Sequence, residues 1–248
     1  MVQIFPLSEG TFTVGHDKEF VPFDTANDVL NERPTGSLLV EVQPFLVVTS
    51  RDIIVFDAGL GFRTKDGALQ IHENIRNAGF EPEDVTKVLM SHLHKDHAGC
   101  MSYEANNGLV VSTFPNATYF IYRDEADFAL KTGKPSFFPH DIEPILASGQ
   151  VAWLEGESGV IDNYISFEHS GGHSPHHIVF LIDNNGEKVF YGGDEAPQLK
   201  QLKIRYVAKY DFDGKKALKL REHYVERATQ EKWKVLFYHD IKVPVGQF

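Results

Sequence analysis

Six consecutive residues, His92 to His97 (His-Leu-His-Lys-Asp-His), constrain the fold of this chain more than any other feature. They follow an apolar run at 85–90 that predicts a short strand. Four imidazole or carboxylate side chains therefore lie just past a strand end, where α/β sheets usually carry their binding sites. Such groups are ligands for zinc and similar divalent metals. The fold must hold this segment at a sheet edge, where more distant ligands can join it.

The four polar groups of this segment are too crowded for one tetrahedral metal site. On a tight loop, His92 and His94 point one way, while Asp96 and His97 turn toward a second point. Two metal ions that share the loop are the simpler geometry.

Three further candidate ligands stand at the ends of later predicted strands. His173 lies in a Gly-Gly-His-Ser-Pro-His-His turn, Asp194 follows Tyr-Gly-Gly, and His239 follows the strand predicted at 235–238. Glycines let the backbone approach closely beside Asp194, whose two oxygens could bridge two metals. We expect His177 to support the site rather than to bind metal.

Hydrophobic periodicity predicts one domain over residues 1–248, with strands, a helix, a strand and a helix, then strands, a helix and a strand. This order fits an α/β (α+β) arrangement with two sheets or four layers better than an alternating doubly wound sheet. The predicted strands are 10–15, 37–48, 52–56, 85–90, 117–122, 160–168, 177–183, 188–191 and 235–238, and the predicted helices are 68–78, 123–131 and 213–228.

Three local signals add detail to this prediction. Asn184-Asn185-Gly186 between apolar runs is a strong hairpin signal. Asp213 is a candidate N-cap for the last long helix. Lys134 to Pro144 holds three prolines and two adjacent phenylalanines, which predicts a loop and a candidate lid near the site.

Composition narrows the choice of partners and compartment. The net charge of −11 argues against nucleic acid and against an anionic membrane surface as partners. Cys100 is the only cysteine, so no intramolecular disulfide can form. Residues 1–10 show no secretory signal, and no window is apolar enough for a spanning helix. We therefore expect a cytoplasmic protein that acts on a small-molecule substrate.

The segment Ser91 to Gly99 resembles the His-x-His-x-Asp-His signature of the metallo-β-lactamase superfamily. The later Gly-His-Ser-Pro-His-His, Gly-Gly-Asp and Phe-Tyr-His-Asp segments resemble its other metal motifs, in the same order. Within the superfamily, the chain looks most like acyl-homoserine lactone lactonases, which are quorum-quenching enzymes, and methyl parathion hydrolase-like proteins. The resemblance implies a four-layer αβ/βα sandwich, and dimers are common in this branch.

The same resemblance implies a division of the ligands between two divalent metal ions. One ion would take His92, His94 and His173, the other would take Asp96, His97 and His239, and Asp194 would bridge them together with a hydroxide. Zinc is the first expectation, although manganese, iron and cobalt accept the same ligands. Asp57, in Phe-Asp-Ala-Gly, resembles a family residue that supports the loop.

A metal pair about 3.5–4 Å apart lowers the pKa of a bridging water, and the resulting hydroxide attacks a carbonyl or phosphoryl centre. Asp96 or Asp194 would take up the proton and pass it to the leaving oxygen. The expected enzyme is a metal-dependent hydrolase of a small ester or lactone.

Two positions depart from the lactonase pattern. Pro197 stands where lactonases carry a tyrosine that polarises the substrate carbonyl, and Tyr206 or Tyr210 could replace it. Lys95 stands where the motif often has an apolar residue. A phosphotriesterase-like or glutathione thioester hydrolase activity on the same metals stays open as an alternative.

Three other functions fit the sequence less well. The acidic charge disfavours a nuclease of this fold. A di-iron oxidoreductase of this fold typically has glutamate in place of His94. A binding protein with a degenerate metal site would not be expected to keep all seven ligand positions.

Overall fold

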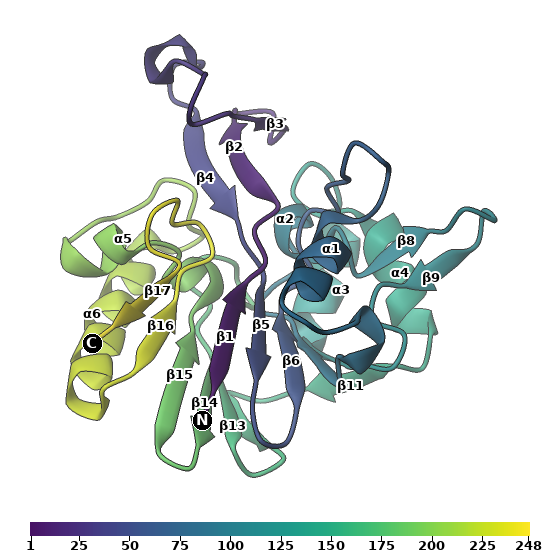
Figure 1. Cartoon of the computed structure of the whole chain (residues 1–248). Coiled ribbons are helices and arrows are strands. Elements are labelled where there is room, and N and C mark those ends of the chain that lie inside the picture. Colours follow the sequence, from purple (N-terminus) through teal and green to yellow (C-terminus); the bar gives the residue numbers. More distant parts are fainter.

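The computed structural model describes residues 1–248 and shows two six-stranded sheets with helices on their outer sides (Figure 1). The predicted four-layer αβ/βα sandwich is therefore confirmed. No helix combines the length and the hydrophobicity needed to cross a lipid bilayer.

The first sheet has the strand order β1-β5-β6-β7-β10-β11. Strands β6, β7, β10 and β11 run parallel to one another, whereas β5 is antiparallel to both of its neighbours, β1 and β6. Its strands are β1 Gln3–Pro6, β5 Phe45–Val48, β6 Ile53–Phe56, β7 Lys87–Leu89, β10 Thr118–Tyr122 and β11 Val151–Leu154.

The second sheet has the order β12-β13-β14-β15-β16-β17 and is antiparallel except where β15 pairs with β16. The turn between β14 and β15 places Asn185 at φ 57° and Gly186 at φ 87°, as a type I′ hairpin requires. The strands are β12 Ser158–Ile161, β13 Ile165–His169, β14 Ile178–Asn184, β15 Glu187–Tyr191, β16 Lys234–Leu236 and β17 Val245–Gln247.

The helices α1, α3 and α4 accompany the first sheet, and α6 accompanies the second (Figure 1). Asp213 caps α6 by accepting a hydrogen bond from the backbone N–H of Lys216, as predicted. The helices are α1 Gln70–Asn77, α2 Lys95–Ala98, α3 Arg123–Thr132, α4 Pro139–Ala147, α5 Leu199–Lys203 and α6 Gly214–Glu231, with 3₁₀ turns η1 Leu30–Glu32, η2 Pro82–Asp84 and η3 Gly193–Glu195.

Three apolar clusters fill the spaces between the four layers. Alternation along each strand distributes its side chains, because successive residues point to opposite faces. Phe56 and Ile54 of β6 lie in the cluster between the sheets, whereas Val55 packs toward α1 with Ile71. On β15, Val189 and Tyr191 face the other sheet, and Phe190 packs against Tyr224 and Trp233 on the α6 side.

Two smaller sheets lie outside the sandwich. The sheet β3-β2-β4 extends beyond the edge of the two main sheets (Figure 1). The pair β8-β9 packs near α4. Their strands are β2 Gly10–Val14, β3 Phe20–Pro22, β4 Leu38–Val42, β8 Ser102–Glu104 and β9 Val110–Ser112.

Three sequence predictions were wrong in detail. The run at 160–168 is two strands of one hairpin, β12 and β13, because Asp162 and Asn163 have positive φ and form a turn between them. The run at 37–48 is two strands in different sheets, because Pro44 has no backbone N–H and the chain changes sheet there. The predicted loop Lys134 to Pro144 ends at Phe138, and Pro139 begins α4, a helix position where its fixed φ is favourable.

Asp52, just before β6, links the two sheets through hydrogen bonds. Its carboxylate accepts hydrogen bonds from Thr86 (2.8 Å), Lys87 (2.5 Å) and the Tyr164 hydroxyl, which precedes β13 of the second sheet. Burial by itself would raise the pKa of Asp52, but the hydrogen bonds from Lys87, Tyr164 and Thr86 outweigh it and lower that pKa. The ionised carboxylate therefore stabilises the fold.

We predict that Asp52→Asn lowers the free energy of unfolding at neutral pH and that this difference shrinks as the pH falls. A carboxyl whose pKa is depressed by folding contributes stability above its unfolded pKa, near pH 4, and loses it on acidification. Urea unfolding of both proteins at pH 7, 5, 4 and 3 measures the effect. A difference that stays constant down to pH 3 would contradict this role of the charge.

Candidate metal centre

The residues between β7 and α2 carry the His-x-His-x-Asp-His segment. The expected tight loop proves to include one helical turn, α2, which begins after His94 and carries Asp96 and His97. The rings of His92 and His97 remain neighbours, with centroids 4.1 Å apart. Asp57, just after β6, supports this segment through hydrogen bonds. Its buried carboxylate accepts hydrogen bonds from the Ser91 N–H and hydroxyl and from His97 Nδ1, each at 2.7 Å. The expectation that Asp57 supports the loop is confirmed.

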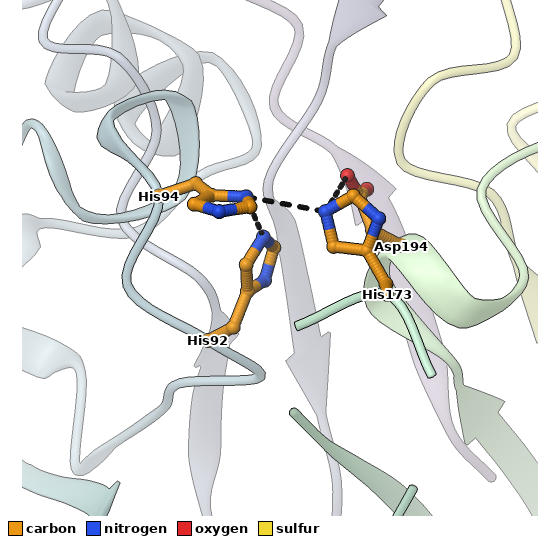
Figure 2. A group of neighbouring side chains, drawn as sticks. All are labelled: His92, His94, His173 and Asp194. Atoms are coloured by element: carbon orange, nitrogen blue, oxygen red, sulfur yellow. Dashed lines mark hydrogen bonds and ion pairs between the residues drawn. The ribbon is translucent and has the colours of Figure 1, made fainter. Parts of the chain in front are cut away.

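The structure brings the first expected ligand set together (Figure 2). His92 Nε2 lies 2.9 Å from His94 Nδ1, which lies 3.1 Å from His173 Nε2. Oδ2 of Asp194 lies 3.1 Å from the same His173 nitrogen. These four side chains come from the β7–α2 loop, the turn after β13 and the turn η3 after β15.

The second expected set lies on the other side of Asp194. Asp96, His97 and His239 form a cluster whose ligand atoms lie within 4.8 Å of one another. Oδ1 of Asp194 is 3.3 Å from His97 Nε2 and 3.1 Å from His239 Nε2. The two oxygens of Asp194 therefore face different sets, and all seven residues lie in the arrangement expected from the sequence.

The hydrogen-bond partners of the imidazoles assign their lone pairs. His97 Nδ1 faces the Asp57 carboxylate, His173 Nδ1 faces Asp211 at 3.0 Å, and His239 Nδ1 faces the Glu41 carbonyl at 2.6 Å. Because these partners are acceptors, each Nδ1 carries a proton, and in the neutral imidazole the lone pair is on Nε2. The Nε2 lone pairs then point at one another and at the carboxylates. These electron-rich atoms repel one another, and bound cations would remove this repulsion.

Two buried atoms at the centre of the cluster have no hydrogen-bond partner, His97 Nε2 and Asp194 Oδ1. Buried polar atoms of this kind are rare in native proteins and indicate a ligand or ion. Within the first set, neighbouring nitrogens lie 2.9–3.1 Å apart. This is close to the distance between two ligand atoms of a tetrahedral zinc site, about 3.3 Å for zinc–nitrogen bonds near 2.0 Å. The residues present therefore fit two divalent ions.

Electrostatics support the same assignment. Burial, with the neighbouring histidines, lowers the pKa of His92 and His94 well below the ordinary value, so both are neutral ligands. Burial alone would raise the pKa of Asp194, but His239, His173 and His97 outweigh it and hold that pKa well below its usual range. Burial would lower the pKa of His97, His173 and His239, but Asp194 and the neighbouring carboxylates outweigh it and raise all three. Without metal these imidazoles attract protons, which a bound cation would displace.

Several buried polar residues that orient the ligands were missed by the sequence analysis. Glu195 accepts hydrogen bonds from the N–H groups of Gly172 (2.6 Å) and His173 (2.8 Å). Glu125 on α3 accepts from the Leu93 N–H and the Ser174 hydroxyl. Only Glu195, beside the Gly-Gly-Asp motif, had a sequence neighbour that could have drawn attention to it.

Asp211 and Arg221 extend this support on the His173 side. Arg221 is 1% exposed, and its guanidinium donates to Asp211 at 2.9 Å and to the carbonyls of Glu195 and Tyr206. The other oxygen of Asp211 accepts the His173 Nδ1–H. His177 is absent from both ligand sets and accepts a hydrogen bond from the Asp194 N–H at 3.2 Å, so the expected supporting role is confirmed.

A cavity of about 350 Å³ opens onto the two ligand sets. His94, Asp96, His173, Asp194 and His239 reach its surface, whereas His92 and His97 lie behind it. One wall is apolar and comes from the small sheet β3-β2-β4, and the opposite wall comes from 197–210. The side chains of these walls include Val14, Phe20, Leu38, Leu39 and Val40 on one side and Pro197, Gln201, Tyr206 and Tyr210 on the other.

A family model described as the metallo-beta-lactamase superfamily matches residues 40–239. The chain belongs to the metallo-β-lactamase superfamily. Among curated superfamily proteins, an N-acyl homoserine lactonase of Bacillus sp. is 29% identical over 172 residues, or 69% of this chain. The N-acyl homoserine lactonase AttM of Agrobacterium fabrum is 30% identical over 57% of this chain and 48% of its own length. The match to the Bacillus protein covers 62% of the length of that relative.

Solved structures of superfamily members show the same fold. A probable metal-dependent hydrolase from Staphylococcus aureus has a TM-score of 0.81 at 22% identity and covers 99% of this chain and 92% of its own. AidC, described as a dizinc quorum-quenching lactonase, has a TM-score of 0.73 at 21% identity and covers 99% of this chain and 90% of its own. At these identities the likeness concerns the fold.

We predict that Asp211→Asn weakens metal binding by about tenfold to a hundredfold, as losses of partners behind metal-binding histidines do. The amide cannot match the carboxylate that faces both His173 and Arg221. Competition with a chromophoric chelator measures the affinity of the variant. Glu226→Gln, an exposed change on α6, is the control and should bind metal like the wild type. Equal affinities in all three proteins would show that Asp211 has no part in holding His173.

Proposed function

We propose that this protein is a dinuclear metal-dependent hydrolase that opens small esters or lactones, with N-acyl homoserine lactones among the candidate substrates. The observation that carries the proposal is the position of Asp194, whose two oxygens face two separate sets of histidine and aspartate ligands. Curated relatives named as N-acyl homoserine lactonases support the lactone class. Zinc is the proposed metal, because imidazole and carboxylate suit it and the similar AidC is described as dizinc.

His92, His94 and His173 would hold one ion, Asp96, His97 and His239 would hold the other, and Asp194 would contact both. When bound, such ions supply a water of lowered pKa and a Lewis acid for the carbonyl oxygen. Asp96 and Asp194 reach the cavity surface, so either carboxylate is placed to accept the proton of the attacking water. The same carboxylate would return this proton to the leaving oxygen.

The cavity fits a small substrate with an apolar portion. Its volume of about 350 Å³ lies in the range of small-molecule sites. The apolar wall from β2, β3 and β4 can bury an acyl chain, and each methylene removed from water contributes about 0.8 kcal/mol. The ester or lactone carbonyl would then lie over the ligand sets at the cavity floor.

The function is tested by loading the purified protein with zinc and measuring hydrolysis of acyl-homoserine lactones, aryl esters, a phosphotriester and a glutathione thioester. We expect about two ions per chain and turnover of lactones or esters that is lost on chelation. His94→Ala should lower the rate at least a hundredfold, since it removes a ligand at the cavity surface. His140→Ala, an exposed histidine outside both sets, is the matched control.

The substrate panel separates the alternatives. Turnover of the phosphotriester or thioester alone would keep the metal centre and reassign the substrate. A folded protein that holds no metal after reconstitution would contradict the proposed mechanism.

We further propose that Tyr210 takes the place of the tyrosine that lactonases carry where this chain has Pro197. Tyr210 lines the cavity beside His173, with ring centroids 5.9 Å apart. Its oxygen accepts a hydrogen bond from Gln201 at 2.9 Å, which leaves the hydroxyl hydrogen free to donate to a substrate carbonyl. Tyr206 also lines the cavity but is 39% exposed.

Tyr210→Phe should therefore lower kcat for lactone opening by roughly tenfold to a hundredfold, the value of a hydrogen bond to a developing negative charge. Metal content should be unchanged. Tyr206→Phe serves as the matched control and should change kcat less than threefold. Steady-state kinetics of the two variants decide between them, and a larger loss in Tyr206→Phe would reverse the assignment.

A further inference from the structure

Three lysines line the cavity, and none of them has a carboxylate partner. Lys18, Lys95 and Lys200 reach its surface, while no ion pair within 4.0 Å involves any of the three ammonium groups. The only carboxylates of the lining are Asp96 and Asp194, which belong to the metal centre. In a chain with a net charge of −11, this is a local concentration of positive charge.

Lys95 is the best placed of the three. It stands between His94 and Asp96, so its backbone is fixed by the ligand loop, and its N–H donates to the Ser136 carbonyl at 2.9 Å. Its ammonium nitrogen lies 5.3 Å from the ring centroid of Phe20 and 5.1 Å from that of Phe138. The two rings hold a half-buried cation at the cavity wall.

Such a wall is unfavourable for a wholly apolar substrate. A half-buried ammonium group loses hydration when an acyl chain covers it. Asp96, Glu19 and Asp17 act on the Lys95 charge, but none of them lies within 4.0 Å to form an ion pair with it. An anionic group on the substrate would compensate for the lost hydration through a charge-assisted hydrogen bond. Lys95 is also the position at which the motif departs from the apolar residue often found there, so the charge is a feature of this chain.

We propose that Lys95, with Lys18 beside the same cavity, selects substrates whose ester or lactone carries a second, anionic group, either a carboxylate or a phosphate. This inference rests on the proposed hydrolase function and narrows its substrate class. The apolar wall takes the methylene portion, the metal centre takes the scissile carbonyl, and the lysines take the anionic end. Lys95 acts as a specificity-determining residue.

The experiment compares phenyl esters of one chain length that end in a carboxylate, a phosphate or a neutral carboxamide. The carboxylate and the carboxamide have nearly the same shape, so their kcat/KM ratio reports the charge alone. We expect the zinc-loaded wild type to prefer one anionic ester over the carboxamide by about tenfold or more. The preference should weaken as salt is added, because ions screen exposed charges. The carboxylate and phosphate esters distinguish the two kinds of anion.

Variants assign the preference to the lysines. Lys95→Met should bring the ratio close to one, Lys95→Arg should retain the preference, and Lys18→Met should reduce it in part. Lys203→Met, which removes an exposed lysine of α5 outside the cavity lining, is the matched control and should keep the wild-type ratio. A wild-type ratio near one, or a preference that survives in Lys95→Met because the metals bind the anion, overturns the inference.

Calorimetric binding of the corresponding anilides separates this inference from the hydrolase function. These amides keep the anionic or carboxamide end and resist hydrolysis. If no ester is turned over, the proposed function fails, yet tighter binding of the anionic anilide that is lost in Lys95→Met would still support the anion site. Equal binding of both anilides would overturn it.

Discussion

The structure depends on one electrostatic constraint, which is that nitrogen lone pairs and carboxylate oxygens converge in a buried space. His97, His173 and His239 each use Nδ1 to donate to an acceptor outside the cluster, so each Nε2 faces inward as a base. Asp194 adds two more electron-rich atoms between them. Two cations would satisfy this arrangement, and the acceptors behind the histidines fix the imidazole rings in it.

The sandwich supplies the rigidity that this constraint requires. Strand ends of both sheets meet at one edge, so ligands that lie up to 147 residues apart in sequence, from His92 to His239, come together on fixed backbone. The walls of the cavity come instead from the small sheet β3-β2-β4 and the segment 197–210. This division lets the metal centre set the chemistry while the walls set the substrate.

The features that could be predicted from the sequence are those whose signal lies within a few neighbouring residues. The motif at 92–97, the glycine-flanked Asp194 and the hairpin at Asn185 each carry their signal within a few residues. Glu125 and Asp211 could not be predicted in this way, because their partners are distant in sequence. Glu125 contacts residues 32 and 49 positions away, and Asp211 contacts residues 10 and 38 positions away. Helix α4 was missed because Pro139 resembles a loop residue unless its place at a helix start is known.

A crystal structure of the zinc-loaded protein, with anomalous data collected on either side of the zinc absorption edge, tests most directly whether Asp194 joins two metal sites. We predict two anomalous peaks, one beside His92, His94 and His173 and one beside Asp96, His97 and His239, with one oxygen of Asp194 on each. A single peak, or an Asp194 carboxylate that contacts only one ion, would contradict the claim that this residue joins two metal sites.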